Sequence, residues 1–239
     1  MPYADVNGLH LYYEEHGEGP PLVLLHGGLM TIELNFRVAL PVLAEHHRVI
    51  AVELQGHGRT ADVDRAPTFP NFAADVVALL DHLGLARADV VGFSLGGLTA
   101  YEMAISYPER IRRAVVASAD HRNDRAGEAD PTRLPTQHDF QAMRDAYSAK
   151  APDPNAFDTV AEKTSGLVQS FTGWTDDQLR GVLMPVLILV GDTDFILVEN
   201  AVEAMRLLPQ GQLAVLPGTT HMDLTRSTLL APVIEAFLA

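Results

Sequence analysis

Ser94 lies in the pentapeptide Gly92-Phe93-Ser94-Leu95-Gly96, which sets a hydroxyl between two glycines. An apolar run over Val90–Phe93 leads into this pentapeptide, and a helical pattern follows it. A strand that turns directly into a helix forces the serine into a strained backbone conformation, and small neighbours let the chain pass closely. Such a turn lifts the hydroxyl clear of the sheet. The motif therefore predicts a nucleophilic serine at position 94.

A serine hydroxyl is a weak nucleophile unless a base takes its proton. The best-placed base is His221, because it ends a loop, Pro217–His221, that follows the last predicted strand, Gln212–Leu216. Loops at the carboxyl ends of parallel strands gather at the ligand crevice of open α/β sheets. The weaker candidates lie in a helical pattern or in loops: His26, His57, His82 and His121.

The base in turn needs an acid to orient it. Asp192 and Asp194 both follow the predicted strand Val186–Val190. We expect Asp192 to stabilise the turn and Asp194 to reach the histidine loop, while Asp120 is a more distant alternative. The chain order Ser94, Asp194, His221 is the order expected for a serine on a strand-turn-helix motif.

The charge that develops on a tetrahedral intermediate needs fixed N–H donors. The backbone N–H of Leu95 is one candidate, since it follows Ser94 at the start of a helix. The second donor is expected from the loop after the strand Leu22–Leu25, with Gly28 preferred and Leu29 next.

Short, β-branched apolar runs that do not alternate with polar residues predict strands covered on both faces, and so a mostly parallel sheet. The Asn7-Gly8 pair predicts a hairpin near the N-terminus. Helical patterns alternate with the later strands, which indicates an α/β fold with right-handed crossovers. The predicted strands are Tyr3–Val6, Leu9–Glu14, Pro21–Leu25, Arg48–Val52, Ala88–Phe93, Ile111–Ser118, Val186–Val190 and Gln212–Leu216. The predicted helices of the body are Phe72–Leu83, Leu95–Tyr107, Asn200–Leu208 and Thr225–Leu238.

Residues 120–183 interrupt this alternation, because they contain no strand pattern. They predict helices over Gln137–Lys150, Asn155–Phe171 and Thr175–Val182, which we interpret as a lid over a site. Large apolar side chains of this segment are candidates to line a pocket, together with two from the body. The candidate substrate-binding residues are Leu29, Phe140, Met143, Tyr147, Phe171, Trp174 and Phe195.

The composition is that of an ordinary globular protein, with 47% apolar and 20% charged residues in a chain of 239. The chain has no cysteine, which excludes a disulfide framework, a cysteine nucleophile and a thiolate metal site. Its net charge of −14 argues against binding to nucleic acids or anionic membranes. The charge also disfavours strongly anionic substrates, unless arginines of the predicted lid turn inward: Arg122, Arg125, Arg133 or Arg144.

No signal peptide or membrane span is predicted, because the N-terminus lacks an apolar core and the longest apolar run, Val182–Val190, contains Pro185. We therefore expect a cytoplasmic protein. No histidine or carboxylate cluster has metal-ligand spacing, and His46-His47 is expected to be a surface turn. We expect neither a metal nor an organic cofactor. The sequence leaves the oligomeric state open between a monomer and a homodimer.

Taken in order, the motifs resemble those of α/β-hydrolase-fold serine hydrolases over nearly the whole chain. The resemblance rests on His26-Gly27, on the turn Gly56-His57-Gly58-Arg59-Thr60, on the pentapeptide around Ser94, on Gly191–Asp194 and on the loop of His221. It implies a doubly wound, mostly parallel sheet of about eight strands, formed by residues 1–119 and 184–239, with residues 120–183 inserted as a helical lid. It also implies that Ser94, Asp194 and His221 form a catalytic triad.

Similar small bacterial members are carboxylesterases, so the resemblance favours cleavage of small-molecule esters through an acyl-enzyme on Ser94. Lactonases and carbon–carbon bond hydrolases with the same triad are alternatives, followed by perhydrolase-like enzymes and by ligand receptors of this fold. Ser94 argues against dehalogenases and epoxide hydrolases, which use an aspartate nucleophile. Gly28-Leu29 stands where perhydrolase-like members often carry an aromatic residue and a proline, which disfavours that alternative.

Overall fold

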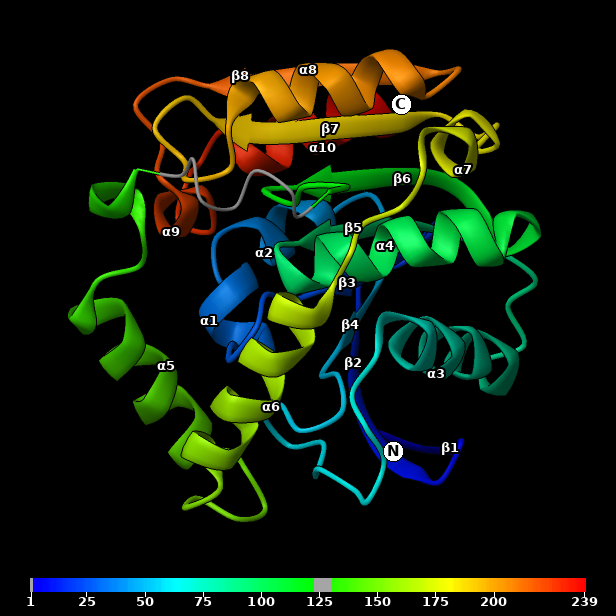
Figure 1. Cartoon of the computed structure of the whole chain (residues 1–239). Helices are drawn as coiled ribbons and strands as arrows, with labels where there is room; N and C mark the ends of the chain where they lie inside the picture. The colour runs from blue at the N-terminus through cyan, green and yellow to red at the C-terminus, as the bar shows by residue number, and fades with distance from the viewer. Residues whose placement is uncertain (1, 123–129) are drawn as a thin grey trace.

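Eight strands form one sheet in the order β1-β2-β4-β3-β5-β6-β7-β8 (Figure 1), in a computed structural model that describes residues 2–122 and 130–239. The first two strands and β4 pair antiparallel, and all further neighbours pair parallel. The predicted doubly wound, mostly parallel α/β sheet is thus confirmed. The strands are β1 Tyr3–Val6, β2 Leu9–His16, β3 Pro21–Leu25, β4 Arg48–Val52, β5 Ala88–Phe93, β6 Ile111–Ala117, β7 Val186–Gly191 and β8 Gly211–Leu216.

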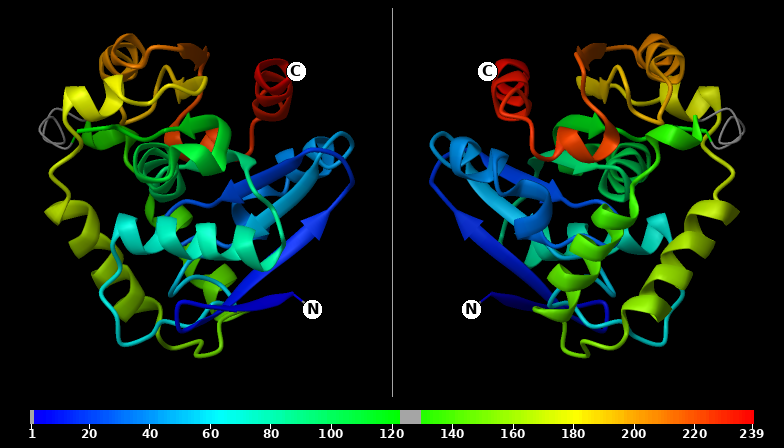
Figure 2. Two further views of the ribbon diagram at one scale, coloured as in Figure 1. Left: turned by 90° about the vertical axis from the view of Figure 1, so that its right-hand side faces the viewer. Right: turned by 90° about the vertical axis from the view of Figure 1, so that its left-hand side faces the viewer.

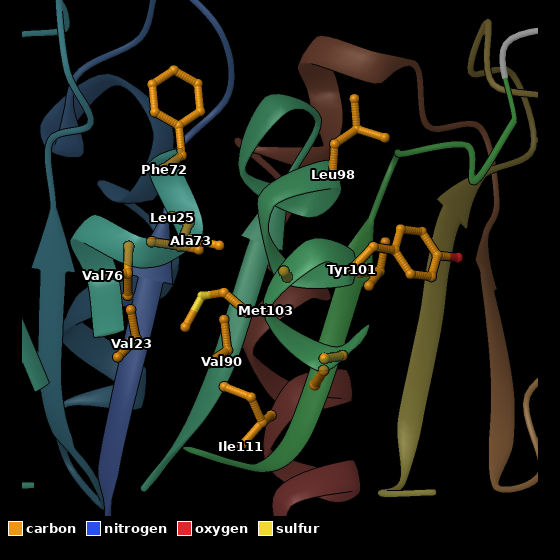
Figure 3. Packing of buried hydrophobic residues seen from close by; sticks show 14 of the residues in the cluster. Val23, Leu25, Phe72, Ala73, Val76, Val90, Leu98, Tyr101, Met103 and Ile111 are labelled. Atoms are coloured by element: carbon orange, nitrogen blue, oxygen red, sulfur yellow. The ribbon is translucent and has the colours of Figure 1, made fainter. Parts of the chain in front are cut away.

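Both faces of the sheet are buried, which explains why its central strands read as continuous apolar runs. Along β3, Val23 and Leu25 belong to one core cluster, whereas Leu22 and Leu24 belong to the other. Figure 3 shows side chains of α3 and α4 packed over Val23 and Val90 on the first of these faces. Successive side chains of a strand point to opposite faces, so a strand covered on both sides must be apolar throughout.

Helices cover the two faces separately (Figures 1 and 2). The first face is covered by α3 Phe69–His82, α4 Leu95–Ser106 and α8 Val198–Leu207. The other face is covered by α1 Ile32–Phe36, α2 Ala39–Leu43, α9 His221–Leu224 and α10 Leu230–Leu238. The short helices α1 and α2 were not predicted, since five residues carry too little periodicity. No described helix has the length and apolar character needed to cross a membrane.

The predicted helix Thr225–Leu238 is found over Leu230–Leu238 as α10, but its predicted start is wrong, because a turn separates α10 from the short helix α9. Thr220 caps α9 by accepting a hydrogen bond from the backbone N–H of Asp223. Pro232 explains the break, since inside one continuous helix its ring would clash with the preceding turn and its missing N–H would lose a bond. In α10 it falls in the first turn, where no N–H partner is required.

Between β6 and β7 the described chain contains helices and no strand, as predicted. The elements are the 3-10 turn Pro131–Arg133, α5 Gln137–Ser148, α6 Phe157–Ser170 and α7 Asp176–Arg180. Thr136 and Thr175 begin α5 and α7 with reciprocal capping boxes, which fix where these helices start. Figure 1 shows α5 and α6 at the end of the sheet to which the arrowheads of β6 and β7 point. The predicted inward arginine Arg125 lies outside the described residues.

Candidate active site

Ser94 occupies the tight turn between β5 and α4, with φ 52° and ψ −114°. Its backbone N–H donates a 2.8 Å hydrogen bond to the carbonyl of Ala117 at the end of β6. The turn depends on glycine, because a Cβ added at Gly96 would overlap the carbonyl of Leu25. A Cβ added at Gly92 would likewise overlap the carbonyl of Gly96. The sequence thus allows a strained serine at the carboxyl edge of the sheet, as the pentapeptide predicts.

His221 lies between Ser94 and Asp194 in one series of hydrogen bonds. Its Nε2 is 3.1 Å from the Oγ of Ser94, and its Nδ1 is 2.9 Å from Oδ1 of Asp194. The imidazole is buried, at 4% exposure, and it lies between two aromatic rings. Its centroid is 4.8 Å from that of Phe93 and 4.2 Å from that of Phe195. The geometry lets His221 take a proton from the serine while the carboxylate holds its opposite nitrogen.

Asp194 is almost fully buried and is held by three donors. Besides His221, the hydroxyl of Ser118 donates to its Oδ2 at 2.6 Å, and the N–H of Ile196 donates to its Oδ1 at 3.0 Å. Burial raises the pKa of this carboxyl, but His221 and the hydrogen bonds lower it further, so the pKa lies below its usual value. The carboxylate is therefore ionised at neutral pH.

The two other candidate acids have different partners. Asp192 accepts a 3.3 Å hydrogen bond from the N–H of Thr219, so it ties the turn after β7 to the loop of His221. Asp120 accepts from the side-chain amide of Asn200 and, at 3.1 Å, from the N–H of Arg122. The structure therefore places Asp194, as preferred on sequence grounds, beside the histidine.

Three other histidines have structural roles. His26 and His57 are fully buried, and burial lowers the pKa of His26 to about 3 and that of His57 to about 4, so both are neutral. The Nε2 of His26 accepts a 3.1 Å hydrogen bond from the N–H of Leu54. His47 is buried and lies 3.2 Å from Glu235. The predicted surface turn of His46-His47 therefore holds for His46, which is exposed, but not for His47, which links the end of α2 to α10.

Gly28 and Leu95, the two candidate donors to an oxyanion, lie side by side. A Cβ added at Gly28 would lie 3.9 Å from side-chain carbons of Leu95. Neither backbone N–H has a hydrogen-bond partner within residues 2–122 and 130–239. The loop before them is fixed by Asn35, whose side chain accepts a 2.9 Å bond from the N–H of Gly27. Leu29 follows with a positive φ of 61°, an unusual conformation for a leucine.

A mostly apolar cavity of about 660 Å³ opens beside Ser94 and His221. Five of the seven predicted substrate-binding residues line it: Leu29, Phe140, Met143, Phe171 and Phe195. The other two do not. Tyr147 is buried against Phe157, with ring centroids 5.6 Å apart. Trp174 is buried among Phe69, Tyr101 and Phe171, and its Nε1 donates a 3.0 Å bond to Glu102.

The model of the α/β hydrolase fold family matches residues 20–170, which include the loop of Gly28, the turn of Ser94 and most of the helical segment. The chain belongs to the α/β-hydrolase fold family. The resemblance inferred from the motifs is confirmed, and with it the expectation of a hydrolase-family enzyme.

A non-heme haloperoxidase of Rhodococcus erythropolis is 28% identical to this chain, over 92% of this chain and 93% of that protein. Several further curated relatives are matched over less than half of their own length. Among solved structures, a serine hydrolase involved in carbazole degradation superposes with a TM-score of 0.85 at 24% identity, covering 99% of this chain and 97% of that one. The enol-lactonase of Burkholderia xenovorans superposes with a TM-score of 0.76 at 22% identity, covering 99% of each chain.

Two side chains of this α/β-hydrolase-fold chain were missed by the sequence reasoning. Ser118 bonds Asp194, and Phe93 packs on the ring of His221. The available signal for Ser118 is a hydroxyl directly after the apolar second half of a strand, Ala114–Ala117. In the part of the chain that the structure describes, no group of three or more histidines or carboxylates is arranged to hold a metal ion.

Proposed function

We propose that this chain is a serine hydrolase that cleaves carboxylic esters of small molecules. The observation that carries the proposal is the hydrogen-bonded series Ser94–His221–Asp194 in the wall of an apolar cavity. In this mechanism Ser94 Oγ attacks the ester carbonyl while His221 Nε2 takes its proton. Asp194 holds the imidazole in orientation and stabilises its protonated form.

The tetrahedral intermediate places a negative charge on the former carbonyl oxygen. Gly28 and Leu95 are adjacent residues of the cavity wall, and their N–H groups, which have no partner among the described residues, are the donors we assign to this oxygen. The alcohol leaves with the proton from His221, and an acyl group stays on Ser94. Water then gives its proton to His221 and attacks the acyl group, which releases the carboxylic acid and restores the serine.

Residues 120–183 are proposed as the helical lid on a core of residues 1–119 and 184–239. The described part of this segment contributes Phe140, Met143 and Phe171 to the cavity wall. Leu134, Phe140 and Val168 line the cavity, and they are nevertheless 47%, 47% and 39% exposed to solvent. An apolar rim of this kind suits the acyl chain or alcohol of an uncharged ester. A cytoplasmic location remains part of the proposal.

Hydrolysis of p-nitrophenyl butyrate tests the proposal. We expect Ser94→Ala to lower kcat by at least about 10⁴-fold while thermal unfolding stays cooperative, because the remaining groups cannot form an acyl-enzyme. Ser148→Ala is the matched control, since this exposed serine on α5 bonds only the carbonyl of Pro154 in the described chain. Unchanged turnover in Ser94→Ala would refute the mechanism. A panel of lactones and carbon–carbon bond substrates, ranked by kcat/KM, would identify the preferred bond.

A second activity is favoured by the full-length match to a haloperoxidase. Hydrogen peroxide can replace water as the acceptor of the acyl group on Ser94, which forms a peracid and frees the serine. Peracid formed from acetate ester and peroxide oxidises bromide, so bromination of an indicator dye would measure this activity. Bromination that persists in Ser94→Ala would exclude the acyl-enzyme as its source.

A further inference from the structure

Asp120 places a carboxylate in the wall of the largely apolar cavity beside Ser94. It follows the last residues of β6, and its side chain is 13% exposed. The triad does not use it, because Asp194 holds His221. A charged group in an apolar wall loses much of its hydration, so it favours a ligand that can replace the lost water.

The carboxylate of Asp120 has neighbours from two segments, α8 and the residues that directly follow Asp120 in the chain. The amide of Asn200 on α8 donates to Oδ2, and the N–H of Arg122 donates to Oδ1 at 3.1 Å. The Nδ1 of His121 lies 3.3 Å from Oδ1. Asn200 also lines the cavity, so the bond to Asp120 is formed at the cavity wall. These contacts hold the carboxylate in place at the edge of the cavity.

Arg122, the arginine among the described lining residues, forms ion pairs with acids other than Asp120. The guanidinium of Arg122 pairs with Asp176 at 2.7 Å and with Glu203 at 2.9 Å, two acids outside the cavity lining. A carboxylate in the wall of a cavity attracts cations and repels carboxylates.

Asp120 is also close enough to Ser94 to contact the same small substrate. The carbonyl of Ala117 accepts the N–H of Ser94 at 2.8 Å, and Asp120 is three residues further along the chain. Three extended residues span at most about 10–11 Å, so the backbone of Asp120 lies within this distance of Ala117. Phe171 lines the same cavity, and its segment pairs with the residues after Asp120 through a 3.0 Å bond from Trp174 N to His121 O. An aromatic face adds a second favourable surface for a cation.

We propose that Asp120 forms a subsite for a positively charged amine of the substrate, so that this hydrolase prefers cationic esters over neutral and anionic ones. This inference rests on the proposed function for the ester bond, but binding to the subsite does not require turnover. The ammonium group contacts Asp120, while the apolar part of the substrate fills the rest of the cavity.

Binding is measured first, by calorimetry on the unmodified chain with three ligands of one shape: hexylammonium, 1-hexanol and hexanoate. We expect hexylammonium to bind at least about tenfold tighter than hexanoate, with hexanol between them, because the ligands differ only in the charge that faces Asp120. In Asp120→Asn, which keeps the size of the side chain, the ratio should fall to within about threefold. Asp145→Asn removes an equal charge from exposed α5 and should leave the ratio unchanged.

Turnover is measured second, with choline hexanoate and its uncharged isostere 3,3-dimethylbutyl hexanoate. The choline ester should have about a tenfold higher kcat/KM, and Asp120→Asn should remove the difference. Equal binding of the three ligands by the unmodified chain would overturn the subsite, whether or not the variant folds. So would a charge preference that Asp145→Asn weakens as much as Asp120→Asn does. Selective binding without hydrolysis of either ester would instead refute the proposed function and leave the subsite standing.

Discussion

The hydroxyl of Ser118 donates a 2.6 Å hydrogen bond to Oδ2 of Asp194, the oxygen that does not face His221. Ser118 has a positive φ of 51°, so the chain at the end of β6 turns in an uncommon way to present this hydroxyl. The bond fixes the plane of the carboxylate and hence the direction of the imidazole that it holds.

Ser118→Ala should lower kcat for p-nitrophenyl butyrate by about tenfold, because a hydrogen bond to a buried charge contributes roughly 1.5–3 kcal/mol and some of it is recovered elsewhere. KM should change little, since the variant leaves the apolar wall in place. Steady-state kinetics measure both constants. Ser118 acts through Asp194, so an effect confined to KM would contradict this role.

Gly96→Ala should unfold the protein or destabilise it by at least about 3 kcal/mol, because the new methyl overlaps the carbonyl of Leu25 and neither backbone can move. Gly166→Ala is the matched control. Nothing described lies within 4 Å of a Cβ at Gly166 inside α6, so that variant should be neutral or more stable by about 0.5–1 kcal/mol. Urea unfolding of the two variants measures the contrast, and equal stabilities would refute the close approach at Gly96.

Phe140→Ala should reduce kcat/KM for a p-nitrophenyl octanoate by about fivefold and that for the acetate hardly at all, because this half-exposed ring lines the cavity rim. Trp174→Phe should leave the ratio of the two substrates unchanged, since Trp174 does not line the cavity. A series of acyl chain lengths provides the measurement. If kcat/KM of Phe140→Ala depended on acyl chain length just as it does in the parent chain, acyl chains would not pass this rim.

The ion pairs of the Glu33 carboxylate should stabilise the protein at neutral pH and should lose this effect in acid. Burial raises the pKa of its carboxyl, but bonds from Arg59 and Lys150 lower it more, from 4.5 to about 2. A lowered pKa means that the contribution is complete above pH 4.5 and is lost as the pH falls toward 2. Glu33→Gln should therefore lower the free energy of unfolding at pH 7 by less than about 1 kcal/mol, because the pair is partly exposed.

The same measurement at pH 3 should show a smaller difference between Glu33→Gln and the parent chain. Glu162→Gln, on exposed α6, should match the parent at both values of pH. A penalty for Glu33→Gln that grows as the pH falls would contradict the assigned ion pairs, which join α1 and the turn of Arg59 to Lys150 after α5.

Much of the sheet was predictable, because strands buried on both faces leave apolar runs whose limits are sharp. All eight predicted strands occur within about two residues of their expected limits. The roles of Asp192 and Asp194 were also predictable, because two residues along the turn decide which acid reaches the imidazole of His221 and which bonds only the backbone of its loop. Pro232 indicates that one continuous helix cannot run through this segment. The apolar periodicity around it nevertheless obscured the break between α9 and α10.

The cavity wall was harder to predict. Tyr147 and Phe140 lie on the same helix, and helical periodicity gives no direction relative to the rest of the fold. Which face turns toward the cavity depends on how α5 packs on α6 and on the body, where Arg226 bonds Asp139 of α5 across 87 residues. The contact between Ser118 and Asp194 spans 76 residues, so only the sheet order of β6 and β7 brings them together.

Trp174 lies where the chain returns from α6 to the body, buried against Tyr101 and Phe171 and bonded to Glu102. It is the one tryptophan in the sequence. Fluorescence excited selectively in tryptophan therefore reports on a single place, the contact between the helical segment and α4. Because Phe171 touches both the indole and the cavity, that intrinsic fluorescence gives an optical readout of ligand entry without any label.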